Sequence, residues 1–219
     1  FADEGADNTF LMVKDVQLFG GFDPDNGITD LTHRRIFDLT NGTILSGDRL
    51  GDDQVSGMGI DLAITNVYDN ACHTVVASGD VGSAVLDGFT ITGGIGREMY
   101  TTIKVKGVTI SRMDAGGLYG ADDASPVLHN LIFRGNWGYH GGGIGGVATP
   151  VISNITFIQN VGTLGAGMWS GNNFTIRNAV FIGNRASNGG GIGFNNNAST
   201  VYPVIENATF VGNYAATSG

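Results

Sequence analysis

The sequence predicts an all-β fold, a right-handed parallel β-helix, and three observations support this prediction. One pattern occurs four times between residues 116 and 219, with an asparagine at 130, 154, 178 and 207, in steps of 24, 24 and 29 residues. The apolar runs within each copy are short, rich in Val, Ile, Thr and Phe, and bounded by Asn and Gly, which favours strands over helices. Glycine blocks separate the copies, at 141–144, 165–168 and 189–192. A fixed period of about 24 residues with room for three short strands is typical of a β-solenoid with stacked rungs.

The residues before 116 are predicted to form less regular rungs of the same solenoid. Strands are expected over 9–13, 16–23, 42–48, 73–80 and 83–94, which are short apolar runs that mostly end in Gly or Asp. The polar segments 24–41 and 49–59 are expected to project from the coil, and 105–111 is interpreted as one further coil. Residues 86–94 align with 128–136, which places Phe89–Ile91 over Leu131–Phe133.

The four regular copies predict stacked columns of side chains. Two apolar columns are expected to point inward, Leu128, Ile152, Ile176 and Ile205, and Phe133, Phe157, Phe181 and Phe210. Two asparagine columns follow, a bend ladder (Asn130, Asn154, Asn178, Asn207) and a turn ladder (Asn136, Asn160, Asn184, Asn213). Asparagine tolerates the left-handed conformation and its amide can bond the neighbouring rung, so both ladders are interpreted as structural. As inward positions they are not expected to carry glycan, although Asn154 and Asn207 lie in Asn-x-Thr contexts.

A single β-helix domain is expected over residues 1–219, irregular over 1–115 and regular over 116–219, because no linker composition separates the two parts. The sequence begins without Met, and no further glycine block follows its last copy. The chain is therefore interpreted as a fragment of a longer protein. Further rungs, another domain or another copy are expected to cover the open C-terminal rung.

Charge and hydropathy restrict the classes of partner. The 219 residues carry a formal net charge of −9, which argues against nucleic acid or an anionic membrane, since both require a basic face. No apolar run reaches the roughly 18 residues of a transmembrane segment. A polysaccharide or a surface receptor is the kind of partner that an acidic, rigid rod is expected to meet.

The repeat residues carry a family resemblance. Phe-x-x-Asn, from Phe133–Asn136 to Phe210–Asn213, and the Gly-Gly-x-Ile blocks resemble the repeats of polymorphic outer-membrane protein adhesins, with glycine where those repeats usually have alanine. The front segments 18–22, 44–48 and 86–94 are similar to the broader right-handed β-helix repeat proteins secreted by environmental bacteria. The resemblance implies a location outside the cell or on a bacterial surface, and it implies the fold more strongly than any activity.

One outward column is a candidate contact surface. The position after each turn-ladder asparagine holds Trp137, Val161, Arg185 and Tyr214, and further aromatic rings lie nearby in sequence. The candidate surface comprises Trp137, Tyr139, His140, Trp169, Arg185 and Tyr214. Such a stripe suits stacking against sugars, packing against another chain, or cover by a loop of the same chain, and the sequence leaves these three open.

If the protein is an enzyme, its catalytic residues are expected in the front half of the chain. Between residues 126 and 219 the single carboxylate is Glu206, so neither an acid pair nor a metal cage is expected there. A catalytic groove would instead lie over Asp80, Asp87, Lys106, Arg112 and Asp114, where opposite charges fall on neighbouring front rungs. Asp122 and Asp123 are weak candidates for a Ca²⁺ loop, with a polar turn as the simpler interpretation; no other cofactor is expected.

These observations favour a non-catalytic structural or adhesive module that acts as a rigid scaffold. The alternatives are a polysaccharide lyase or glycoside hydrolase, and a carbohydrate-binding module, on the same fold.

Overall fold

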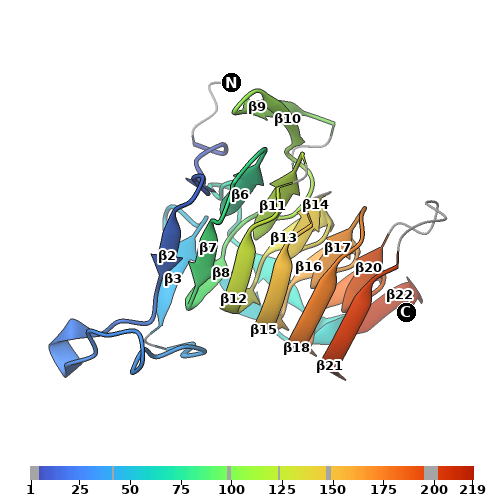
Figure 1. Cartoon of the computed structure of the whole chain (residues 1–219). Helices are drawn as coiled ribbons and strands as arrows, with labels where there is room; N and C mark the ends of the chain where they lie inside the picture. The colour runs from blue at the N-terminus through green and yellow to red at the C-terminus, as the bar shows by residue number, and fades with distance from the viewer. Residues whose placement is uncertain (1–4, 41, 98–99, 123, 147–148, 195–201) are drawn as a thin grey trace.

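The computed structural model describes residues 5–40, 42–97, 100–122, 124–146, 149–194 and 202–219. Strands dominate these ranges, and three parallel sheets run along the molecule (Figure 1). The only helices described are two 3-10 turns in loops, η1 (Pro24–Asn26) and η2 (Gly59–Asp61). The fold is therefore all-β, with the stacked parallel sheets that a parallel β-helix requires.

The strands are distributed over the three sheets in a repeating order. The first sheet contains β1 (Phe10–Leu11), β6 (Val75–Ser78), β11 (Leu118–Ala121), β14 (Ile144–Gly146), β17 (Met168–Ser170) and β20 (Ile192–Phe194). The second contains β2 (Gln17–Phe19), β3 (Thr43–Ser46), β7 (Val85–Asp87), β8 (Phe89–Thr92), β12 (Val127–Arg134), β15 (Val151–Ile158), β18 (Thr175–Ile182) and β21 (Val204–Val211). The third contains β13 (Trp137–His140), β16 (Val161–Leu164), β19 (Arg185–Asn188) and β22 (Tyr214–Ser218). We use the word layer for one level of the stack, which has one strand in each sheet that reaches that level.

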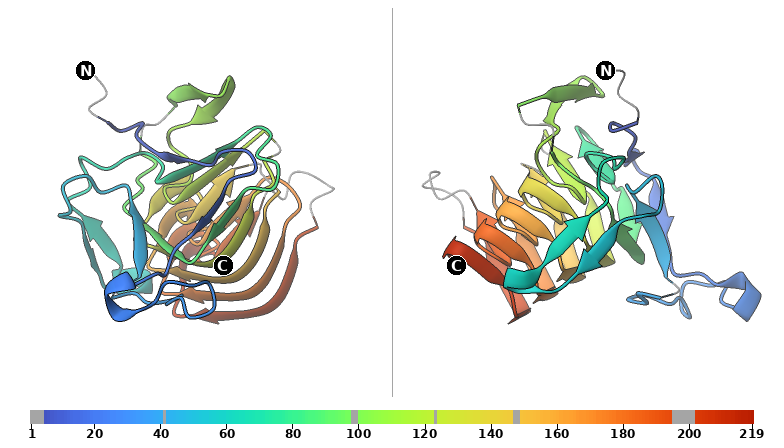
Figure 2. Two further views of the ribbon diagram at one scale, coloured as in Figure 1. Left: turned by 60° about the vertical axis from the view of Figure 1, so that its left-hand side comes forward. Right: turned by 180° about the vertical axis from the view of Figure 1, so that it is seen from behind.

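The register between layers follows the sequence period. Phe133 pairs with Phe157, Phe157 with Phe181, and Phe181 with Phe210, all in parallel ladders. The expected alignment of 86–94 with 128–136 is confirmed, because Leu128 pairs with Leu86 and Phe133 with Ile91. The view turned by 60° shows the layers nested one behind another (Figure 2).

Two antiparallel hairpins leave this stack. One joins β4 (Gln54–Ser56) to β5 (Ala63–Thr65), and the other joins β9 (Thr102–Val105) to β10 (Val108–Ser111). The interpretation of 105–111 as a further coil is therefore wrong. Lys106 and Gly107 both adopt positive φ, 50° and 83°, and this tight turn reverses the chain before it can reach a neighbouring layer.

Both predicted apolar columns form the core. Leu128, Ile152 and Ile176 are at most 1% exposed, and Phe133, Phe157 and Phe181 are fully buried. The phenylalanine rings stack with centroids 4.7–5.3 Å apart and interplanar angles of 5–16°. In the last layer the same columns are open, with Ile205 41% and Phe210 51% exposed.

The turn ladder points inward and is fully buried from Asn136 through Asn184. Asn160 Oδ1 accepts bonds from the main-chain N and the Nδ2 of Asn136, both at 3.1 Å, and Asn160 Nδ2 donates to the Phe133 carbonyl at 2.8 Å. The pattern repeats between Asn160 and Asn184. Each buried amide therefore satisfies main-chain groups of the layer beside it.

The bend ladder also forms, but on the outer surface. Its four members have φ of 52–54°, and each Nδ2 of the later three donates to the Oδ1 of the preceding asparagine at 2.8–3.1 Å. Asn178 and Asn207 are exposed and Asn154 is half-buried. The expectation that these positions face inward is wrong, and burial gives no argument against glycan at Asn207. The left-handed bend turns the side chain outward while the apolar neighbours on either side stay in the core.

Candidate functional site

The segment from 48 to 70, called the 48–70 excursion, leaves the front of the molecule and lies along the regular layers. Gly59 N donates to the Gly183 carbonyl at 2.9 Å, and Gln159 Nε2 donates to the Gly57 carbonyl at 2.8 Å. Arg185 Nη1 donates to the Leu62 carbonyl at 3.0 Å. The excursion therefore bonds to successive layers rather than projecting freely into solvent, as was expected for residues 49–59.

The excursion docks on one repeated position of the layers. In three of the four regular layers that position is a glycine with φ of 59–62°, namely Gly135, Gly183 and Gly212. In the remaining layer, the one after Gly135, it is Gln159 with φ 54°. A Cβ at Gly135 would lie 2.7 Å from Val55, and a Cβ at Gly183 would lie 2.9 Å from Met58, so the excursion leaves no room there. Gln159 accepts a disfavoured backbone conformation and uses its amide to hold Gly57. In the sequence, the signal for this docking site is the glutamine at position 159, where the other three copies have glycine.

A groove of 320 Å³ lies between the excursion and the third sheet. The lining residues are Leu62, Ala63, Ile64 and Val67 from the excursion, and Ile95, Trp137, Val161 and Arg185 from the layers. Trp137, Val161 and Arg185 are paired in register on three consecutive layers, and Tyr214 follows Arg185 on the next. The groove therefore offers an indole, 36% exposed, and a guanidinium on an otherwise apolar wall.

The other predicted contact residues form a second aromatic group. The His140 ring lies 4.7 Å from Tyr139 and 4.4 Å from Trp169, measured between centroids. His140 Nδ1 bonds Asp114 Oδ1 at 2.7 Å, which fixes the imidazole. The six predicted contact residues are thus divided between the groove column and this cluster.

The five predicted catalytic residues each have a partner outside the set. Asp80 accepts a bond from Lys14 at 2.5 Å, which lowers the pKa of Asp80, and Lys106 Nζ donates to the Met12 carbonyl at 3.2 Å. Arg112 pairs with Asp7, and Asp114 with His140. Asp87 is 8% exposed and pairs with Arg34. Of the weak Ca²⁺ candidates, Asp122 has φ 53° in a turn and Asp123 lies outside the described residues.

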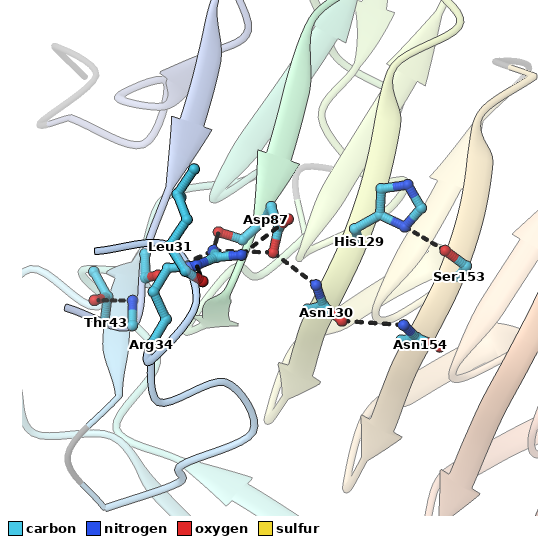
Figure 3. A network of polar contacts seen from close by, with 10 residues as sticks. Leu31, Arg34, Thr43, Asp87, His129, Asn130, Ser153 and Asn154 are labelled. Carbon is cyan, nitrogen blue, oxygen red and sulfur yellow. Dashed lines mark hydrogen bonds and ion pairs between the residues drawn. The ribbon is translucent and has the colours of Figure 1, made fainter. Parts of the chain in front are cut away.

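Asp87 belongs to a polar network that joins residues 22–40, called the 22–40 loop, to the layers (Figure 3). Arg34 makes two bonds to the Asp87 carboxylate at 3.2 and 3.3 Å and a third to the Gly20 carbonyl at 3.2 Å. Asn130 Nδ2 donates to Asp87 Oδ1 at 2.9 Å, so the carboxylate also begins the bend ladder. Asp87 therefore has a structural role that accounts for its burial.

A carboxylate cluster lies where the 48–70 excursion leaves and rejoins the layers. One oxygen from each of Asp48, Asp52 and Asp69 lies within 4.8 Å of the others. Asp53 is next to them, and burial raises its pKa to about 6, against the lowering effect of a bond from Asn70 and with further raising by Asp48, Asp69 and Asp52. The sequence places Asp52 and Asp53 in a polar segment and Asp48 at the end of an expected strand, and it does not bring them together with Asp69, which lies 16 positions after Asp53.

No family model, curated protein or solved structure matches the chain. Within the described ranges, no helix has the length and apolar character needed to cross a membrane. The candidate function therefore depends on the geometry of the groove and of the charged groups.

Proposed function

We propose that the chain is an extracellular structural and adhesive module of a bacterial surface or secreted protein, without catalytic activity. In this proposal the stacked sheets form a right-handed parallel β-helix with rungs of about 24 residues. Support comes from the in-register layers, the stacked phenylalanine column and the two asparagine ladders, which together give a rigid rod. The likeness of the repeats to adhesin repeats supports the same location and role.

The groove between the 48–70 excursion and the third sheet is the proposed contact site for carbohydrate. Trp137 offers an aromatic face of the kind on which the apolar face of a sugar ring stacks, and Arg185 offers N–H donors beside it. The observation that carries the proposal is the composition of the lining, in which the described residues include no carboxylate. Glycoside hydrolysis needs two carboxylates across the scissile bond, so this groove is suited to binding rather than cleavage.

A second contact is proposed at the last described layer. Ile205, Phe210 and Val211 are 41–54% exposed there, whereas Ile176 and Phe181 in the preceding layer are fully buried. A further layer, such as one from another copy of the chain, would cover this apolar surface as each layer covers the one before it.

The binding proposal is tested by affinity gel electrophoresis of the chain through neutral and acidic polysaccharides. We expect retardation by at least one polysaccharide and its loss in Trp137→Ala. Tyr68→Ala is the matched control, because Tyr68 is an aromatic residue of the same excursion, 89% exposed and outside the groove lining. Absence of retardation in every gel, or equal retardation of wild type and Trp137→Ala, would contradict the proposal.

The same polysaccharides, incubated with the chain and Ca²⁺, distinguish binding from catalysis. New reducing ends or unsaturated uronate products would favour the alternative of a hydrolase or a lyase. Asp87→Ala is a poor probe of that alternative, since it also removes the partner of the buried Arg34. Arg112→Gln tests it at a less buried position.

A further inference from the structure

The carboxylate cluster of the 48–70 excursion has the geometry of an ion site. Asp48 lies two residues after the end of β3, and Asp69 lies two residues before Ala71, whose N donates to the Gly47 carbonyl at 2.9 Å. The two ends of the excursion are therefore side by side, and the cluster joins them. Calcium binds oxygen ligands at about 2.3–2.6 Å, so two oxygens on one ion are at most about 5 Å apart. The oxygens of Asp48, Asp52 and Asp69 meet this limit, since all lie within 4.8 Å of one another.

A second observation comes from Asn70, which is 0% exposed. Its Nδ2 donates to Asp53 Oδ2 at 2.7 Å and to the Gly93 carbonyl at 2.9 Å, while its Oδ1 has no hydrogen-bond partner. Asp53 Oδ1 is also shielded from solvent and without a partner. Buried oxygens without a donor are rare because they cost free energy, and a bound cation would satisfy them.

The neighbouring hydrogen bonds leave the cluster short of positive charge. The main-chain N–H groups of Arg49 and Leu50 donate to Asp69 Oδ2 at 3.0 and 2.9 Å, and a carboxylate keeps further lone pairs beyond such bonds. The Arg49 side chain lies alongside, with Nε on the main-chain oxygen of Asp69. One guanidinium offsets one charge, whereas Asp48, Asp52, Asp53 and Asp69 contribute four carboxylates.

We propose that Asp48, Asp52 and Asp69 bind one calcium ion at the base of the excursion, with the unpartnered Oδ1 of Asp53 as a further ligand. The ion would clamp the two ends of the excursion together. Since Leu62, Ala63, Ile64 and Val67 of the same excursion form one wall of the groove, calcium would also order that wall.

The test uses the full chain, made metal-free with EDTA and dialysed, and titrated with CaCl₂ by isothermal calorimetry. We expect one site with a dissociation constant of about 10⁻⁵ to 10⁻³ M, in the range of extracellular calcium modules and sensors. At about 100 times that concentration the thermal midpoint should rise by about 5–10 °C. Asp52→Asn and Asp69→Asn should each weaken binding at least about tenfold, and MgCl₂ should bind at least about tenfold more weakly than CaCl₂.

Asp122→Asn is the matched control, because it removes a carboxylate from the turn that the sequence suggested for Ca²⁺. Asn at position 69 retains an oxygen for the Arg49 and Leu50 N–H groups, so the variant keeps the local fold. Absence of saturable binding, unchanged affinity in Asp52→Asn and Asp69→Asn, or loss of binding in Asp122→Asn alone would each overturn the proposal. Equal affinity for magnesium would overturn the assignment to calcium.

Discussion

The regular layers after residue 116 and the irregular front share two sheets and differ in the third. The first sheet has six strands and runs through the whole stack, whereas the third has four strands, from β13 to β22. In the front, the chain leaves the stack as the 22–40 loop, the 48–70 excursion and the β9–β10 hairpin. The regular layers repeat one set of apolar and amide contacts, while the buried ion pair, the carboxylate cluster and one groove wall come from the departures. In this stacked fold, varied chemistry lies where the chain leaves the repeat.

The comparison is tested first through the phenylalanine column. Phe157→Ala should lower the free energy of unfolding by about 3–5 kcal/mol, because it removes a fully buried ring stacked on two others. Phe210→Ala is the control within the same column, 51% exposed, and should cost about half as much or less. Chemical denaturation measures both, and equal losses would show that the last layer is as well covered as the middle ones.

An ion pair in the front, Arg34 with Asp87, should contribute nearly as much to the free energy of unfolding. Arg34→Gln removes the guanidinium from a nearly buried pair with Asp87, whose side chains are 9% and 12% exposed, and should cost about 3 kcal/mol. Arg177→Gln breaks the pair with Glu206, whose side chains are 54% and 52% exposed. This control should change stability by less than about 1 kcal/mol. A smaller loss for Arg34→Gln than for Arg177→Gln would mean that the 22–40 loop is not anchored through Asp87.

The two asparagine ladders should differ in the same way. Asn160→Ala leaves the buried main-chain N–H of Asn136 without a partner and should cost about 2–3 kcal/mol. Asn178→Ala, in the exposed bend ladder, removes bonds that water can replace but also a residue suited to φ 54°, and should cost about 1 kcal/mol. Similar losses at both positions would contradict the distinction between an inner and an outer ladder.

The repeat made much of this predictable. Residues 24 or 29 positions apart lie on neighbouring strands because the layers stack in register. This spacing accounts for the register, both apolar columns, both ladders and the Arg177–Glu206 pair. The outward direction of the bend ladder was missed because strand alternation does not hold through a left-handed bend. The contacts of Gln159 with Gly57, and of Arg34 with Asp87, could not be predicted, since they join segments with no common period.

The smallest expected effect is on pH dependence. His73 is buried, and burial lowers its pKa below 6.5. The Ala115 carbonyl, which accepts a bond from His73 Nδ1 at 2.8 Å, and the nearby Asp114 and Asp7 act in the opposite direction. Below pH 6.5 the unfolded chain therefore binds a proton that the folded chain does not, so the free energy of unfolding decreases as the pH is lowered. This contribution to the pH dependence should be absent in His73→Asn, whose amide can still donate to Ala115, and unfolding of both proteins measured between pH 7 and 5.5 checks it. Parallel pH profiles of the two proteins would assign no such role to His73.

The central claim is that the regular layers serve as a scaffold on which the 48–70 excursion builds the groove, and Gln159→Gly tests it most directly. The substitution places glycine at φ 54°, as in the other layers, and removes the amide bond to Gly57. Global stability should be unchanged or slightly higher, while amide hydrogen exchange over residues 54–65 accelerates by about fivefold, as loss of roughly 1 kcal/mol implies. If exchange there remains as slow as in the wild type, or if the whole chain loses stability together, the excursion is not a separately docked element and the account is contradicted.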